Sequence, residues 1–321
     1  MQRVKLLLRE RGTKSLEFSQ QTILREKIAY QPLYDALSYF MKEVWLDFLH
    51  PALLSISCEA VGGNAENTIQ MGAAIVLLAG GADVHDDIID QSITKGSKPT
   101  VFGKFGKDIA ILAGDALLFK GLYLLNDAIR RLPDEKRRQI LESVKEAFLG
   151  VSSAEAKEAG WRGRTDLSGE EYLDIIKMKV GVAQATARLG AILGDGTVEE
   201  IEMLSRYGRT FGILNTVRDE YIDVFEADEL KNRAKKECLP LPILVTFKDP
   251  EKKAAILQLL KQPLTEKNME KILDLTMDSA ETRNLTEEMK TLMRQELQLI
   301  SSVKSCQVEL KLLLTASVEN L

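Results

Sequence analysis

The sequence has few cysteines. Only Cys58, Cys238 and Cys306 occur among 321 residues, and none belongs to a Cys-x-x-Cys pair. Their wide spacing argues against a disulfide framework and against a structural zinc site, and it favours a reducing compartment. The chain begins with "MQRVKLLLRERG", whose apolar patch is too short for a signal peptide and is surrounded by charge. We therefore predict a cytoplasmic protein.

Long runs of one residue type are also missing. The net charge is −5, acidic and basic residues are interspersed, and no basic stripe is interleaved with aromatic side chains, so nucleic-acid binding has no support. We find no apolar run of membrane-spanning length and predict no transmembrane segment. No Gly-x-x-x-x-Gly-Lys-Ser/Thr stretch indicates a nucleotide site. The apolar residues, 45% of the total, nevertheless suffice for a large buried core.

Helical periodicity is abundant, whereas strand-like alternation is almost absent. Apolar residues recur every three or four positions in six long segments. These segments are 33–57, 69–89, 109–130, 135–159, 169–193 and 198–225. Glycine and proline breakers separate them, and Asp134 and Thr197 are suited to cap the helices that follow. We predict one all-α domain over residues 1–321 with about ten or more helices, in which the more polar residues from about 265 to 321 form a helical appendage.

An acidic cluster follows the most apolar segment. The run "MGAAIVLLAGGADV" is apolar nearly all round, which predicts a buried helix, and its end carries Asp83, Asp86, Asp87 and Asp90. On a helix these carboxylates are neighbours and repel one another, and a helix C-terminus disfavours anions. A hard cation offsets both costs, so an oxygen-only cluster of this kind predicts Mg²⁺. We expect the adjacent His85 to pack or hydrogen-bond rather than bind metal.

A second cluster repeats the first. In "RTFGILNTVRDEYIDVF", the residues Asp219, Glu220 and Asp223 have the spacing of Asp-Asp-x-x-Asp and again end a largely apolar helix. One such cluster is more typical of a solvated helix face. Two clusters that face each other across a cavity would form a site for metal ions and a diphosphate.

The two clusters resemble the aspartate-rich motifs of the trans-isoprenyl diphosphate synthases (polyprenyl synthetases), and the resemblance extends from about residue 33 to about residue 244. It implies the class I terpenoid-synthase fold, a helical bundle around a central apolar cavity. It also implies a prenyltransferase of isoprenoid biosynthesis that binds an allylic prenyl diphosphate through Mg²⁺. The implied metal ligands are Asp86, Asp87, Asp90, Asp219, Glu220 and Asp223. Glu220 stands where the family usually has aspartate.

The resemblance also assigns roles to lysines. Lys179, in "YLDIIKMKVGVAQATARLG", matches a diphosphate-binding lysine and joins Asp86, Asp87 and Asp90 as a candidate catalytic residue, although Val180 replaces the usual threonine. The alternative is a lysine that extends its charge from a helix surface. Further candidates for substrate binding follow the two motifs. They are Lys236 in "KKECLPLP", and Lys95 and Lys98 at the place of an arginine pair in the family.

The departures from the family concern the second substrate. In "VWLDFLHPALL", Asp47 and His50 stand where family members have a lysine and an arginine that bind isopentenyl diphosphate, and Ala79 replaces a histidine. An aspartate there repels phosphate. Three functions therefore remain open: a chain-elongating prenyltransferase, a terpene synthase that acts on one prenyl diphosphate, or a non-catalytic subunit. Because the family forms dimers, we expect a homodimer or a heterodimer with an intact synthase.

The small residues before the first motif suggest a long substrate channel. Ala82 and Gly81 lie about one helical turn before Asp86. In the resembling family, large residues at this depth give short products and small ones admit longer chains. We therefore predict that Gly81 and Ala82 line an apolar channel for tails of about twenty carbons or more.

Overall fold

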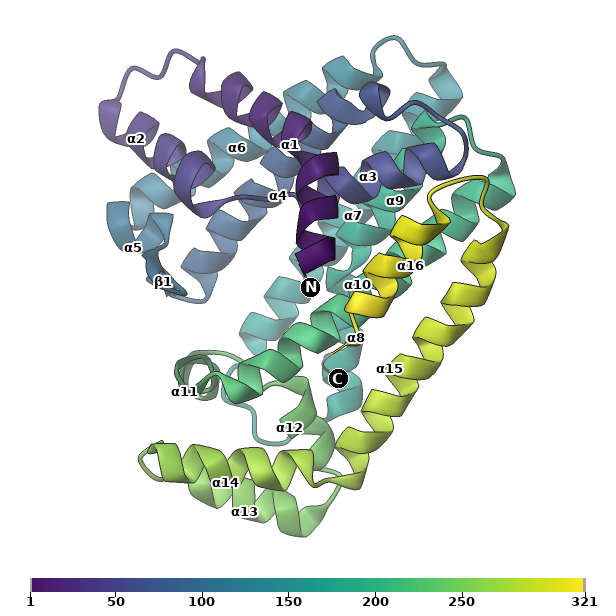
Figure 1. Cartoon of the computed structure of the whole chain (residues 1–321). Helices are drawn as coiled ribbons and strands as arrows, with labels where there is room; N and C mark the ends of the chain where they lie inside the picture. The colour runs from purple at the N-terminus through teal and green to yellow at the C-terminus, as the bar shows by residue number, and fades with distance from the viewer. Residues whose placement is uncertain (1, 320–321) are drawn as a thin grey trace. The chain divides into compact units, whose positions relative to one another are not determined.

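The computed structural model describes residues 2–319 of the chain and is built almost entirely of α-helices (Figure 1). The helices are α1 (Gln2–Leu24), α2 (Gln31–Tyr39), α3 (Leu49–Ala60), α4 (Ile69–Ile89), α5 (Val101–Phe105), α6 (Lys107–Ile129), α7 (Asp134–Gly160), α8 (Gly169–Lys179), α9 (Gly181–Leu193), α10 (Val198–Phe225), α11 (Ala227–Lys236), α12 (Leu241–Thr246), α13 (Pro250–Leu260), α14 (Glu266–Met277), α15 (Ala280–Leu299) and α16 (Gln307–Ala316). The π turn η1 (Phe40–Val44), the 3₁₀ turns η2 (Ala65–Thr68) and η3 (Ile300–Ser302) and the strands β1 (Thr94–Lys95) and β2 (Lys98–Pro99) are short. The all-α prediction is confirmed.

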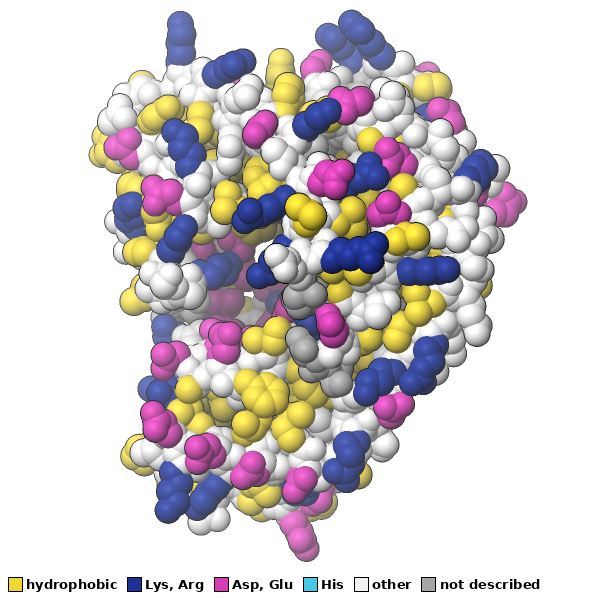
Figure 2. Space-filling model, in the orientation of Figure 1, with side chains coloured by type: hydrophobic (Ala, Val, Ile, Leu, Met, Phe, Trp, Pro, Cys, Tyr) yellow, Lys and Arg dark blue, Asp and Glu magenta, His cyan; other side chains and the backbone are white. Residues whose placement is uncertain are grey.

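The chain divides into two compact units, each described by itself. Unit 1 contains the residues up to Lys145 together with Ala185–Gly208 and Ser302–Leu310. Unit 2 contains Glu146–Gln184, Arg209–Ser301 and the residues from Lys311 on. The segment predicted to be an appendage is shared between the units, and the single domain stays a prediction. Figure 2 shows lysine and arginine intermixed with aspartate and glutamate over the face in view, as the interspersed charges of the sequence suggest.

Helix α4 forms the centre of unit 1. Its apolar residues, among them Met71, Val76 and Leu77, are buried, and it packs most extensively against α6, with α1 and α3 on other sides. By length and composition the segment Ala65–Ile89 could cross a membrane, with a mean hydropathy of 1.2, so the expectation that no run reaches that length was wrong. However, 61% of its most apolar window is buried inside the protein, which is typical of a core helix.

The helix boundaries follow the predicted segments closely, with two exceptions. Residues 69–89 and 198–225 match α4 and α10, and Thr197 begins α10 with a capping box, because Glu200 N donates to its hydroxyl and its own N donates to Glu200. The segment 33–57 is divided, because Asp47 starts a new helix at Leu49. The segment 169–193 is divided at Val180, where α8 ends.

Helices α4 and α6 approach so closely that only glycine fits at their contact. A Cβ atom added to Gly81 would lie 2.7 Å from Leu118 Cγ and 2.9 Å from Gly114 O, and one added to Gly114 would lie 2.5 Å from the His85 ring. The expectation that Gly81 faces an open channel was therefore wrong, because its face meets α6. Ala82 is half-buried, and its place in a channel stays a prediction.

Gly81→Ala is expected to lower the free energy of unfolding by about 1–3 kcal/mol, because the added methyl meets the Gly114 carbonyl, which cannot rotate away as a side chain would. The control is Gly150→Ala on α7, where the nearest atom lies 3.6 Å from the added Cβ. That change should stabilise by up to about 1 kcal/mol, because alanine is the better helix former. Chemical denaturation followed by circular dichroism measures both. Equal stability of the two variants would contradict the close helix contact.

In unit 2, α12 packs against α8, α14 and α15 and buries Leu241, Ile243 and Leu244. Helix α10 is joined to α15 by the buried Tyr221, whose hydroxyl lies 3.0 Å from Thr282 O and 2.9 Å from Thr286 Oγ1. These contacts support the end of α10, which carries the second acidic cluster.

Candidate active site

The first acidic cluster lies at the C-terminal end of α4 and holds a lysine. The Asp87 side chain is only 3% exposed. Lys95 Nζ lies 2.5 Å from Asp83 Oδ1 and 3.6 Å from Asp87 Oδ1. The second oxygens of Asp83 and Asp87 are buried and accept no hydrogen bond within the described part of the chain. One ammonium thus faces more carboxylate oxygens than it satisfies, as expected of a cation site.

Burial raises the pKa of Asp87 to about 7, with Lys95 opposing this shift and the nearby Asp83 adding to it. For Lys95, burial acts to lower the pKa, but the carboxylates of Asp83 and Asp87 outweigh it and the net direction is upward. The lysine therefore stays charged at neutral pH, whereas Asp87 has a pKa well above that of an ordinary carboxyl group. A divalent cation would favour the ionised form of Asp87.

A short hairpin brings Lys95 to this cluster. Strands β1 and β2 pair Lys95 with Lys98, and Gly96 has a φ of +59° in the turn, a conformation that glycine adopts readily. Lys98 points away from the acidic cluster, and its Nζ donates a hydrogen bond to Glu43 O at 2.5 Å. The structure thus joins only the first of these two predicted substrate-binding lysines to the acidic cluster.

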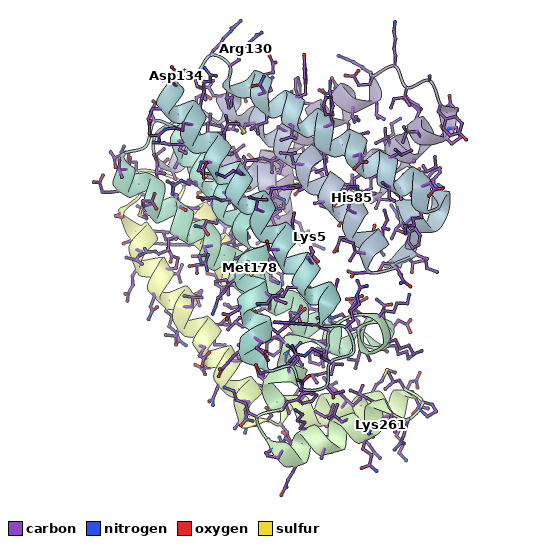
Figure 3. The ribbon with its side chains drawn as sticks, turned by 180° about the vertical axis from the view of Figure 1, so that it is seen from behind. Lys5, His85, Arg130, Asp134, Met178 and Lys261 are labelled. Atoms are coloured by element: carbon purple, nitrogen blue, oxygen red, sulfur yellow. The ribbon has the colours of Figure 1, made fainter. Side chains whose placement is uncertain are left out.

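His85 lies beside the aspartates in sequence but turns toward α6 (Figure 3). Its Nε2 lies 3.3 Å from Ile111 O and 3.3 Å from Asp115 Oδ1. The expected packing and hydrogen-bonding position is confirmed.

The second acidic cluster, at the end of α10, is bound to arginines. Asp219 Oδ1 accepts a hydrogen bond from Arg218 Nη2 at 3.0 Å, and burial raises the Asp219 pKa. Asp223 Oδ2 lies 2.5 Å from Arg233 Nη1, and burial raises its pKa to about 7 although Arg233 opposes the shift.

Glu220 has a different environment from its two neighbours. It is buried, and its oxygens accept hydrogen bonds from Arg233 Nη2 at 3.1 Å and from Leu241 N at 2.8 Å, with the Tyr172 hydroxyl at 3.3 Å. Metal ligation by Glu220 stays a prediction, and it would require these bonds to break. The contacts instead favour a structural anchor.

Sequence reasoning missed Arg233. It stands in the strongly basic segment of α11, where the usual expectation is a solvated face, yet it is 5% exposed. A weak signal is present, because Arg233 follows the buried Leu230 by three residues and therefore shares its face of the helix.

The other predicted lysines differ in their surroundings. Lys179 Nζ, at the end of α8, lies 3.0 Å from Glu155 Oε1 and 2.5 Å from Glu158 Oε2 on α7. Burial acts to raise the Glu158 pKa, but Lys179 outweighs it and the net direction is downward. Lys236 is exposed at the last residue of α11. Its role in substrate binding stays a prediction.

The donor chemistry of the first cluster fits Mg²⁺. Among residues 2–319, no three His, Cys, Asp or Glu side chains are grouped as a ready-made metal cage. Mg²⁺ rarely uses such a cage, because it typically binds one or two carboxylates and completes its shell with water and substrate phosphates. The orphaned buried oxygen of Asp87 suits this pattern. Because the two acidic clusters belong to different units, their meeting across a cavity stays a prediction.

Asp47 and His50 form a hydrogen-bonded pair at the start of α3. Asp47 Oδ1 accepts from Leu49 N at 3.0 Å and His50 N at 3.1 Å, and its Oδ2 lies 2.8 Å from His50 Nδ1. Burial opposes both charges, but the pair lowers the Asp47 pKa and raises the His50 pKa. The pair acts as a helix cap.

This pair predicts a pH dependence of stability. Because the folded pKa of His50 is raised above its usual 6.5, its contribution is complete below pH 6.5 and is lost as the pH rises through the folded value. The contribution of Asp47 is present above its usual 3.8 and is lost as the pH falls through its lowered folded value. We expect His50→Gln to flatten the decline of the melting temperature above pH 6.5, measured by calorimetry. An unchanged decline would mean that another group causes it.

Comparison with known proteins identifies the family of this chain. Residues 48–276 match the family described as Polyprenyl synthetase. The chain is 32% identical over 234 residues to a geranylgeranyl diphosphate synthase of Sulfolobus acidocaldarius, and the match covers 70% of each chain. It is 34% identical over 182 residues to a short chain isoprenyl diphosphate synthase of Methanothermobacter thermautotrophicus, and that match covers 56% of this chain and 55% of the relative. The solved geranylgeranyl pyrophosphate synthetase of Pyrococcus horikoshii has the same fold, with a TM-score of 0.87 at 24% identity over 100% of this chain and 99% of that one.

The fold is thus the all-α terpenoid-synthase fold, and the class is that of the prenyltransferases of isoprenoid biosynthesis. The chain belongs to the polyprenyl synthetase family.

Proposed function

We propose that this protein is an isoprenyl diphosphate synthase that binds an allylic prenyl diphosphate through Mg²⁺ and its two acidic motifs. The observation that carries the proposal is the first cluster, where Asp83 and Asp87 keep buried oxygens without hydrogen bonds beside Lys95. The substrate carbon–oxygen bond breaks, and both electrons leave with the diphosphate. Bound Mg²⁺ would neutralise that departing charge.

The residues of this chain supply the rest of the site. Asp86, Asp87 and Asp90 would hold metal at the first motif, and Asp219 and Asp223 would do so at the second. Lys95 and Lys179 each carry an ammonium beside acidic side chains and would contact diphosphate oxygens. Buried apolar helices around the allylic cation would exclude water that otherwise quenches it.

The choice of reaction follows the relatives, which are named as geranylgeranyl and short chain isoprenyl diphosphate synthases. We therefore propose chain elongation to a product of about geranylgeranyl size, in which the allylic carbon forms a bond to the double bond of isopentenyl diphosphate and the adduct then loses a proton to restore a double bond. Asp47 and His50 are paired with each other, so other residues of the chain would bind the second diphosphate. The two alternatives, a terpene synthase and a non-catalytic subunit, predict different results in the experiment described next.

The test incubates the purified protein with Mg²⁺ and labelled farnesyl diphosphate, with and without isopentenyl diphosphate. A longer product that requires both substrates supports the proposal. A hydrocarbon or alcohol formed from farnesyl diphosphate alone indicates a terpene synthase. Binding without any product contradicts an independent enzyme and indicates a subunit.

We also propose a homodimer in the cytoplasm. Helix α6 exposes an apolar face, of which Leu112 is 51%, Phe119 75% and Leu122 52% exposed. Such a face on one helix suits a second copy of the chain. Light scattering after size-exclusion chromatography should show a dimer, and Phe119→Glu should shift it toward monomer. A monomeric wild-type protein would contradict the homodimer, and co-purification with an intact synthase would replace it by a heterodimer.

A further inference from the structure

Arg233 is the centre of a buried network in unit 2. Each guanidinium nitrogen donates to a protein acceptor: Nε to Cys238 O at 2.8 Å, Nη1 to Asp223 Oδ2 at 2.5 Å, and Nη2 to the Tyr172 hydroxyl at 2.8 Å. Nη2 also reaches Glu220 Oε2 at 3.1 Å. The buried guanidinium of Arg233 therefore binds two carboxylates of the second acidic motif, those of Asp223 and Glu220.

Tyr172 extends this network to another helix. Its hydroxyl accepts from Arg233 and donates to Glu158 Oε1 at 2.7 Å. Glu158 presents its other oxygen to Lys179 Nζ at 2.5 Å. A continuous path of contacts thus connects Asp223 on α10 with Lys179 on α8, and each link lies within unit 2.

The buried residues of this path restrict the positions of the two side chains at its ends, Lys179 and Asp223. Tyr172 is 2% exposed and Arg233 5%, so neither side chain can move without disturbing its neighbours. Lys179 and Asp223 are the partly exposed ends, with side-chain exposures of 29% and 24%. A lysine on a flexible stem binds an anion better when its partners already hold its position.

We infer that Tyr172 and Arg233 are positioning residues, which hold Lys179 and Asp223 in place for a metal-bound diphosphate. This inference rests on the proposed function, because the ligand is the diphosphate of that site. Neither residue touches the substrate in this role. Tyr172 acts through Glu158 on Lys179, and Arg233 acts directly on Asp223.

Tyr172→Phe tests the path with the removal of one hydroxyl. Tyr207→Phe is the matched control, because Tyr207 is also buried and its hydroxyl donates to Leu310 O at 2.9 Å, outside the path and outside both acidic motifs. Calorimetry with Mg²⁺ measures the affinity of each variant for farnesyl diphosphate and for inorganic diphosphate. Melting temperatures measure the structural effect of each lost hydroxyl.

We expect Tyr172→Phe to weaken the binding of both ligands by about tenfold, and Tyr207→Phe to leave both affinities within about twofold of wild type at a similar loss of melting temperature. Equal affinities of the two variants would overturn the inference and leave the proposed function standing. If Tyr172→Phe weakens the affinity for farnesyl diphosphate but not for inorganic diphosphate, the inference is also overturned, because the substitution would then act on the binding of the prenyl tail. Failure of the wild-type protein to bind either ligand removes both proposals.

Discussion

Asp86→Asn is expected to weaken Mg²⁺-dependent binding of a prenyl diphosphate by about a hundredfold, on the order of 3 kcal/mol, while the melting temperature stays the same or rises. The carboxylate is one of the proposed metal ligands of α4. Its removal also relieves repulsion within a cluster where burial and neighbouring acids already raise the Asp87 pKa to about 7. Calorimetric titration with farnesyl diphosphate, in Mg²⁺ and then in chelator, measures the loss.

Asp134→Asn is the control for the change in net charge. Asp134 begins helix α7, its side chain is 97% exposed, and it pairs with Arg137 rather than with the acidic cluster. We expect the affinity of this variant to remain within about twofold of wild type, because exposed charges interact weakly. If Asp86→Asn binds as tightly as Asp134→Asn, the metal site at the end of α4 is refuted.

Arg233→Met should produce the largest loss of stability, about 3–5 kcal/mol in the free energy of unfolding. Methionine fills a similar volume but leaves Glu220 as a buried carboxylate without its cation. The control is Arg138→Met, because Arg138 pairs with Glu135 at the surface and its side chain is 76% exposed. This control should change stability by no more than about 0.5 kcal/mol. Urea denaturation compares the two variants.

The double variant Arg233→Met with Glu220→Gln separates charge from packing. Glutamine removes the uncompensated charge, so the double variant should be more stable than Arg233→Met alone. If the double variant is less stable than the single one, the loss comes from packing or from the bonds to Tyr172 and Cys238. The charge pair would then not be the main contribution of Arg233.

Sequence patterns predicted most of the helices because helix formation depends on neighbours three and four residues apart. Residues 69–89 and 198–225 were predicted to the residue, as α4 and α10 show. The prediction for 33–57 was wrong because the break depends on the Asp47 side chain bonding to Leu49 N. The channel prediction was wrong at Gly81 for a related reason. A small residue opens space only if no other helix occupies it, and here Leu118 and Gly114 of α6 do.

The sequence by itself determined the helices, the two acidic clusters at the ends of apolar helices and, through its motifs, the family. These features are local, so spacing along the chain is enough to find them. Only the tertiary structure decided which charges meet. Glu220 is held by an arginine 13 residues away and a tyrosine 48 residues away, and Lys95 rather than Lys98 reaches the first cluster. Such pairs depend on which segments folding brings together, and a charged residue has the same appearance in sequence whether its partner is water or a buried carboxylate.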